Sequence, residues 1–155
     1  MRSIFEAITT FLEADEWPLH RIGEDTAYSM TFRGEHGQWT CVAQAYEEER
    51  MFIFYSACPV AAPPERRSAV AEFLVHANYE LAFGNFEMEL PTGDIRFRTS
   101  IALPAQELDS ILVSQVVYGN VLAMDRYLVG VRAVAEEGKS FEEAYQLVIN
   151  QVEEE

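Results

Sequence analysis

Basic residues are scarce in this chain. Its 155 residues include 11 Lys and Arg against 26 Asp and Glu, and the formal net charge is −15. Proteins that neutralise nucleic-acid phosphates or lie on anionic lipid present surfaces of Lys and Arg. We therefore expect neither nucleic acid nor a membrane as a partner. The acidic surplus leaves two interpretations open, which are solubility through self-repulsion and recognition of a basic partner segment.

Cysteine is also scarce, and only Cys41 and Cys58 occur. Two cysteines do not make a disulfide framework, and a zinc site needs paired ligands at short spacing. Neither cysteine has a cluster of basic residues near it in sequence that would lower its pKa and make it reactive. We expect both to be small buried residues in strands.

Long apolar runs are missing, but apolar residues are not. No run approaches the roughly 18 residues of a membrane-spanning helix, and Glu6 interrupts the N-terminal segment before a signal-peptide core could form. We expect a cytoplasmic protein. The 49% of hydrophobic residues, with ten Phe and seven Tyr, suffice for a core. The length fits one domain, which we expect over residues 1–155.

Motifs of the common catalytic sites are absent. The sequence contains no GxxxxGK[ST], GxGxxG, HExxH or GxSxG pattern. His20, His36 and His76 are far apart in sequence. Cys41, His76 and Asn78 would supply a thiol, a base and an orienting group, but no local signature joins them. We predict no catalytic residue, no cofactor and no metal, and hence no enzyme.

The first half of the chain alternates apolar and polar residues in the manner of an antiparallel sheet. An amphipathic helix is predicted first, over 3–16. Four strands then form a meander, and we expect them over 19–22, 26–33, 38–46 and 50–57.

The next elements are a helix over 64–82 and a hairpin. In the hairpin we place Leu90 opposite Ile95 across a turn at 91–94. This register puts Glu89 opposite Arg96 and Glu87 opposite Arg98, and such opposite charges favour pairing.

The last third reads as a helix over 105–137 and a final helix that Ser140 and Glu143 begin as a capping box. The long helix would span roughly 45–50 Å, more than the roughly 40 Å diameter of a compact domain of this length. It must bend at Gly119 or Gly130, break in two, or project beyond its domain. The predicted fold is α+β, in the order α-β-β-β-β-α-β-β-α-α.

The long helix carries two adjacent apolar stripes, one more than a single sheet needs. A twofold interface would bury the second stripe. We therefore predict a surface for a homodimer or a protein partner at Leu112, Val116, Ala123, Tyr127 and Val134.

A run of short motifs resembles the signature of the YbjN family of bacterial proteins. Residues 70–74 read VAEFL, 77–81 ANYEL, 84–90 GNFEMEL and 93–100 GDIRFRTS, and the helix of 116–128 reads VVYGNVLAMDRYL. The likeness covers residues 66 to about 132. One departure is Thr92, where the family pattern commonly has an acidic residue before the glycine of the turn.

The resemblance implies an α+β fold similar to that of type III secretion chaperones, which are small acidic dimers that hold partner segments. Some relatives are described as sensory-transduction or stress regulators, and the family supplies no catalytic residue. We expect the signature positions to be structural, with Asn78 at a helix end and Tyr79 burying its ring. The alternative places Asn78, Tyr79 and Asn85 on a recognition surface. The full set of signature positions is Asn78, Tyr79, Gly84, Asn85, Phe86, Arg96 and Arg98.

These observations favour a non-catalytic adaptor, regulator or chaperone-like protein that acts as a homodimer and binds unidentified proteins. The alternative is a small-molecule sensor, with a pocket between sheet and helices lined by Trp39, Phe52, Phe54 and Tyr127. An enzyme of unrecognised type ranks third, and a nucleic-acid-binding protein ranks last because of the charge.

Overall fold

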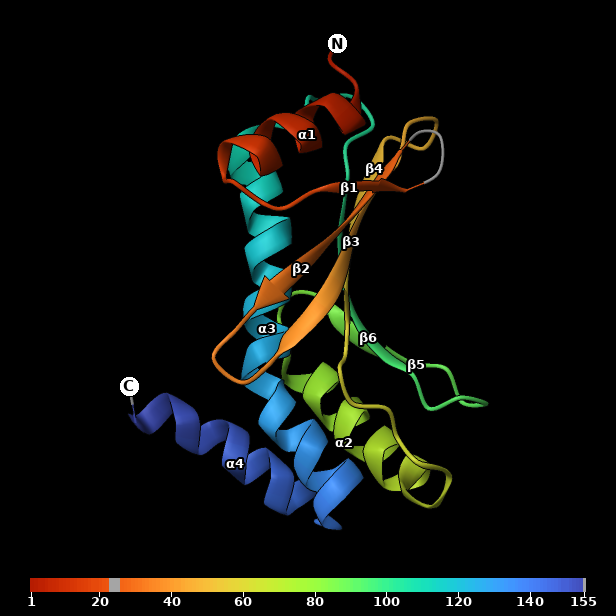
Figure 1. Ribbon diagram of the computed structural model, residues 1–155, viewed down its shortest axis with the longest axis vertical. Coiled ribbons are helices and arrows are strands. Elements are labelled where there is room, and N and C mark those ends of the chain that lie inside the picture. The colour runs from red at the N-terminus through yellow and green to blue at the C-terminus, as the bar shows by residue number, and fades with distance from the viewer. Residues whose placement is uncertain (23–25, 155) are drawn as a thin grey trace.

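The computed structural model describes residues 1–22 and 26–154. The chain has an α+β fold with one antiparallel sheet (Figure 1). The strand order is β1-β2-β3-β4-β6-β5. The strands are β1 (His20–Ile22), β2 (Ala27–Arg33), β3 (Gln38–Tyr46), β4 (Met51–Ala57), β5 (Asn85–Met88) and β6 (Ile95–Ala102). The helices are α1 (Ile4–Ala14), α2 (Arg67–Glu80), α3 (Ser110–Glu137) and α4 (Phe141–Glu154), and a 3-10 turn, η1 (Pro64–Arg66), precedes α2.

The predicted order of elements is confirmed. Strands β1 to β4 form the meander, and β6 then pairs with β4, so that β5 becomes an edge strand. One face of the sheet is buried under helices. In β3 this face carries Trp39, Cys41, Ala43 and Ala45, which are all buried. No helix of the described residues is long and apolar enough to cross a membrane.

Helix α3 runs along the longest axis of the molecule, with α1 across its N-terminal part and α2 and α4 beside its C-terminal half (Figure 1). It begins at Ser110 and not at 105, because the Asp109 carboxylate accepts the N–H of Leu112 at 2.9 Å and caps it there. It continues unbroken for 28 residues, or about 42 Å. The length is accommodated because the helix extends beyond the sheet and packs between α2 and α4.

Gly130 permits this packing and does not break the helix. A Cβ atom there would lie 3.0 Å from Val148 of α4 and closer still to the ring of Phe73 of α2. Helix α4 begins at the predicted capping box. The Ser140 hydroxyl accepts the N–H of Glu143 at 3.2 Å, and the Ser140 N–H donates to the Glu143 carboxylate at 3.1 Å.

Candidate functional site

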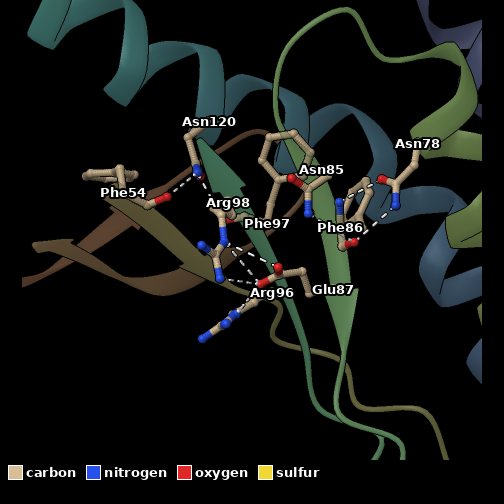
Figure 2. A network of polar contacts seen from close by, with 9 residues as sticks. All are labelled: Phe54, Asn78, Asn85, Phe86, Glu87, Arg96, Phe97, Arg98 and Asn120. Carbon is tan, nitrogen blue, oxygen red and sulfur yellow. Dashed lines mark hydrogen bonds and ion pairs between the residues drawn. The ribbon is translucent and has the colours of Figure 1, made fainter. Parts of the chain in front are cut away.

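Asn78 of the family signature closes the edge of the sheet. Its Oδ1 accepts the N–H of Phe86 at 2.7 Å, and its Nδ2 donates to the carbonyl of Phe86 at 3.1 Å (Figure 2). Phe86 lies in β5, the edge strand, whose outward groups would otherwise be unpaired. A carboxamide offers a donor and an acceptor together, so Asn78 takes the place of a neighbouring strand. These two bonds favour a structural role for Asn78, which stays a prediction.

Gly84 supplies the turn that leads from α2 into β5. Its φ is +82°, in the left-handed region, and a Cβ there would lie 2.7 Å from the ring of Phe97. Any other residue would strain the backbone and collide with that ring. The neighbouring Asn85 is half-buried, and its Nδ2 lies 3.5 Å from the Phe86 carbonyl. These contacts favour a structural role for Gly84 and Asn85 in the hairpin.

The hairpin register is two residues away from the one predicted. Met88 and not Leu90 lies opposite Ile95, and Glu87 and not Glu89 lies opposite Arg96. The loop is longer than expected, and its Glu89 N–H bonds to the carbonyl of Asp94. A shift of two keeps every side chain on its face, which is why alternation alone could not reveal it.

A single carboxylate therefore serves both arginines of the signature. Glu87 lies 2.6 Å from the Nε of Arg96 and 3.3 Å from that of Arg98 (Figure 2). Both guanidinium groups also lie over the ring of Tyr55, at 4.4 and 5.2 Å from its centroid. Partial burial raises the pKa of the Glu87 carboxyl, but the hydrogen bond and charge of Arg96, followed by those of Arg98, outweigh it and hold the pKa below its ordinary value.

A buried amide, which was not predicted from the sequence as a site residue, fixes α3 to the sheet. Asn120 is fully buried. Its Nδ2 donates to the carbonyls of Phe54 and Phe97, at 2.9 and 3.0 Å, and to the hydroxyl of Thr99 at 3.1 Å. Its Oδ1 accepts from the Ser56 hydroxyl at 2.6 Å. The available signal was an asparagine within an apolar helical face, because a buried amide requires partners.

The second apolar stripe of α3 is largely covered within this one chain, so the prediction of a continuous exposed stripe is wrong. A partner surface stays a prediction at Leu112 and Val116, which line a hollow beside the helix. Val116, Tyr127 and Val134 are buried within this one chain, and Leu112 and Ala123 are half-buried. The rings of Phe73 and Tyr145 pack against Tyr127 from α2 and α4. The prediction assumed that only the sheet would bury apolar residues of α3, and it did not consider α2 and α4.

The exposed apolar side chains of α3 lie on a neighbouring line. Ile111 is 68% exposed and Leu122 is 59% exposed, with Gln115 and Gly119 between them at helical spacing. Phe83, which follows α2, approaches Gly119 so closely that a Cβ there would lie 3.1 Å from its ring. Beside this line is a hollow of about 480 Å³, which we call the α3 groove, lined by Phe83, Ser100, Ile101, Leu112, Gln115, Val116 and Gly119.

A second apolar surface lies on α2. Tyr79 is 86% exposed and Val75 is 69% exposed, so the prediction that Tyr79 buries its ring is wrong, because Phe73 and Ala77 occupy the inward face. The hollow beside them, of about 530 Å³, is the α2 patch, and it is lined by Ala71, Glu72, Val75, His76, Tyr79 and Phe141.

The predicted small-molecule pocket does not exist as such. Trp39, Phe52, Phe54 and Tyr127 are all buried members of one hydrophobic cluster. Phe52 and Phe54 contact each other edge to face at 6.5 Å, and the Trp39 indole donates to Ser56 at 2.9 Å. These side chains fill the space that a ligand would need.

The two thiols are poor nucleophiles. Burial raises the pKa of Cys41 to about 12 and that of Cys58 to about 11. Cys41 is buried in β3 as predicted, whereas Cys58 is half-buried and directly follows β4. His76 packs against the rings of Phe141 and Tyr145, and Asn78 is engaged with the edge strand, so Cys41, His76 and Asn78 do not form a catalytic group.

Among the described residues, three of metal-binding type lie together where the turn between β2 and β3 meets α3. They are Glu35, His36 and Asp125, whose ligand atoms lie within 4.8 Å of one another. The Asp125 carboxylate already accepts the backbone N–H groups of Glu35 and His36, at 3.1 and 2.8 Å. It therefore anchors the turn to α3, and a metal is not needed to explain it. The remaining histidine, His20, lies exposed in β1.

A solved structure resembles this chain in fold, and a family model matches its sequence. No curated protein matches it. One chain from the crystal structure of the ExsC–ExsE complex matches with a TM-score of 0.53 and 10% identity, covering 86% of this chain and 94% of that chain. At this identity the likeness shows the fold alone, and it confirms the predicted resemblance to type III secretion chaperones.

The family is established by sequence. A family model described as "Putative bacterial sensory transduction regulator" matches residues 5–132, from α1 through most of α3. That range contains Asn78 at the sheet edge, Gly84 at the turn and Asn120 under the sheet. The chain belongs to the YbjN family.

Proposed function

We propose that this protein is a non-catalytic regulator that binds another protein, acts as a homodimer and works in the cytoplasm as a single domain in sensory transduction. Two comparisons support the proposal, namely the family description and a fold neighbour that was solved as a complex of two proteins. The observation that carries it is the α3 groove with the exposed apolar line beside it.

The α3 groove has the properties of a site for an apolar side chain. Its lining is mainly apolar, and Ile111 and Leu122 extend the apolar surface along the helix. Exposed apolar residues that adjoin one another mark interaction surfaces, whereas isolated ones are common on any protein. Burial of one Leu-sized side chain there would contribute about 1.5–3 kcal/mol. We infer that a partner segment places such a residue beside Phe83.

Site-specific photo-crosslinking in cells tests this assignment. A photoreactive amino acid at Gln115, on the rim of the groove, is expected to give a discrete adduct with the partner. Gln146, an exposed glutamine of α4, is the matched control and should give none. Leu122→Glu should abolish the Gln115 adduct. No adduct at Gln115, or the same adducts at both positions, would refute the proposal.

We place the homodimer at the α2 patch. Val75 and Tyr79 are four residues apart on one helix face, so a twofold axis that crosses α2 between them would pair Val75 with Tyr79 of the copy and bury both. Size exclusion with light scattering should give twice the 17.6 kDa mass. Val75→Glu combined with Tyr79→Glu should give a monomer, and Leu122→Glu should not. A monomeric wild type at tens of micromolar would refute the dimer, and a dimeric double variant would refute its placement.

A further inference from the structure

Helix α1 ends in a turn with a strained backbone. This turn brings acidic and aromatic side chains together. The N–H of Glu16 bonds to the carbonyl of Glu13 at 3.1 Å, and the N–H of Trp17 bonds to that of Leu12 at 3.0 Å. This is a Schellman ending, which usually has glycine where Glu16 stands. Glu16 has a φ of +60°, and a side chain in that conformation costs roughly 1–2 kcal/mol. The turn sets Asp15 and Glu16 beside the indole of Trp17.

Three aromatic rings from distant segments meet at this turn. The indole of Trp17 stacks on Phe32 of β2, with centroids 5.7 Å apart, and lies tilted against Tyr118 of α3 at 6.1 Å. The Trp17 indole N–H donates to Oδ2 of Asp15 at 2.9 Å, and the Tyr118 hydroxyl donates to the same oxygen. Partial burial and the Asp15 carboxylate raise the pKa of Tyr118, so the phenol remains the donor.

One acceptor of this cluster therefore stays available. Within the described residues, Oδ1 of Asp15 accepts no hydrogen bond, since both donors use Oδ2. The carboxylate of Glu16 lies next to it in sequence, and the last turn of α1 contains no basic residue. The C-terminal carbonyls of a helix add further negative potential.

A hollow of about 190 Å³ opens at this turn, between the end of α1, strand β2 and Tyr118 of α3. We call it the α1 pocket, and it is lined by Asp15, Glu16, Trp17, Pro18, Thr31, Phe32, Arg33 and Tyr118. It is smaller than sites for whole ligands, which run to roughly 300–1,000 Å³. A single side chain is the suitable occupant. Aromatic faces combined with carboxylates are the chemistry that recognises an organic cation.

Arg33 is the basic residue in this lining. Its Nε donates to Oε1 of Gln38 at 3.2 Å, across the β2–β3 pair. This bond ties the side chain to the neighbouring strand. The positive charge of Arg33 weakens the attraction of the pocket for a cation, and its removal should strengthen it.

We propose that the α1 pocket binds a lysine or arginine side chain of the protein partner. The inference rests on the proposed function, and it places a basic residue in the partner segment, which agrees with the net charge of −15. Tyr118 lines the α1 pocket and the adjacent Gly119 lines the α3 groove. A segment that crosses α3 could thus reach both hollows, with a basic residue in one and an apolar residue in the other.

Small cations test the α1 pocket without any partner protein. The probes are the Nα-acetyl amides of arginine and lysine, and the neutral control is the same derivative of norleucine. The readout is the NMR shift of the Trp17 indole N–H in the full chain. The two cations should give saturable shifts in the millimolar range that weaken with added salt, and norleucine should give none.

Isosteric variants locate the binding. Asp15→Asn should lower the affinity of the pocket for the two cations by about threefold, which is the scale of an exposed ion pair. Arg33→Gln should raise that affinity. Shifts that do not saturate, that norleucine reproduces, or that are unchanged in Asp15→Asn would overturn the proposal. These results are separate from the cross-linking. Loss of the Gln115 adduct refutes the α3 groove, and loss of the cation shift refutes the α1 pocket.

Discussion

Replacement of Asn120 by alanine is expected to destabilise the protein more than any surface change. The side chain is fully buried, and its amide makes four hydrogen bonds that join α3 to β4 and β6. Figure 2 shows Asn120 beside two of these partners, Phe54 and Phe97. Alanine removes the donor and the acceptor and leaves their partners without access to water. A buried polar group that loses its partner costs about 1–3 kcal/mol.

The four hydrogen-bond partners of Asn120 are not affected equally by its replacement. The hydroxyl of Ser56 keeps the indole donor of Trp39, and that of Thr99 keeps the carbonyl of Val116 as its acceptor. The carbonyls of Phe54 and Phe97 lose a donor outright. Counting these two carbonyls at about 1.5 kcal/mol each, with a smaller term for the hydroxyls, we expect the free energy of unfolding to fall by about 3–4 kcal/mol. Domains are commonly stable by only about 5–15 kcal/mol.

Urea unfolding followed by circular dichroism measures this change. Gln115→Ala, on the exposed face of the same helix, is the matched control and should stay within about 0.5 kcal/mol of wild type. A double-mutant cycle between Asn120→Ala and Ser56→Ala should give a coupling of about 1 kcal/mol. A loss below about 1 kcal/mol for Asn120→Ala would refute the reasoning, since it would mean that water or a shifted side chain replaces the amide.

Three further predictions concern the signature and the thiols. Asn78→Asp keeps the acceptor and loses the donor at the sheet edge, so we expect a loss of about 1–2 kcal/mol in urea unfolding and faster amide exchange in β5; wild-type exchange there would contradict it. Because the pKa of Glu87 lies below its ordinary value of 4.5 in the folded state, its ion pairs stabilise the protein above that pH and are lost as the pH falls. Glu87→Gln should therefore lower the melting temperature more at pH 7 than near pH 3, and an equal effect at both would refute the assignment. With pKa values of about 12 and 11, buried Cys41 and half-buried Cys58 should react with a thiol reagent at pH 8 much more slowly in the native protein than after unfolding; labelling of the native protein as fast as that of the unfolded chain would contradict this.

The predictions that proved wrong concern places where two segments of the chain pack against each other. The hairpin was recognised, but its register was wrong by two residues, because an even shift leaves both faces of the strand intact. The apolar stripes of α3 were recognised as well. Which of them is covered depends on α2 and α4, and periodicity within one helix does not contain that information.

In the candidate sites too, single segments could be recognised from the sequence, but contacts between segments could not. The family signature was visible in sequence, but the bond from Asn78 to Phe86 required the helix and the edge strand to be placed together. The α1 pocket could not be predicted, because Trp17, Phe32 and Tyr118 belong to a turn, a strand and a helix that are far apart in the chain.

By itself the sequence determined the fold class, the order and type of the elements, the family and the excess of negative charge. These follow from local causes, which are side-chain periodicity, caps, turn residues and composition. The tertiary structure alone decided which apolar residues remain exposed, which amide lies buried under the sheet and which acidic and aromatic groups converge at the end of α1. Those outcomes depend on contacts between residues distant in sequence, because burial is a property of the packed chain and not of any one segment.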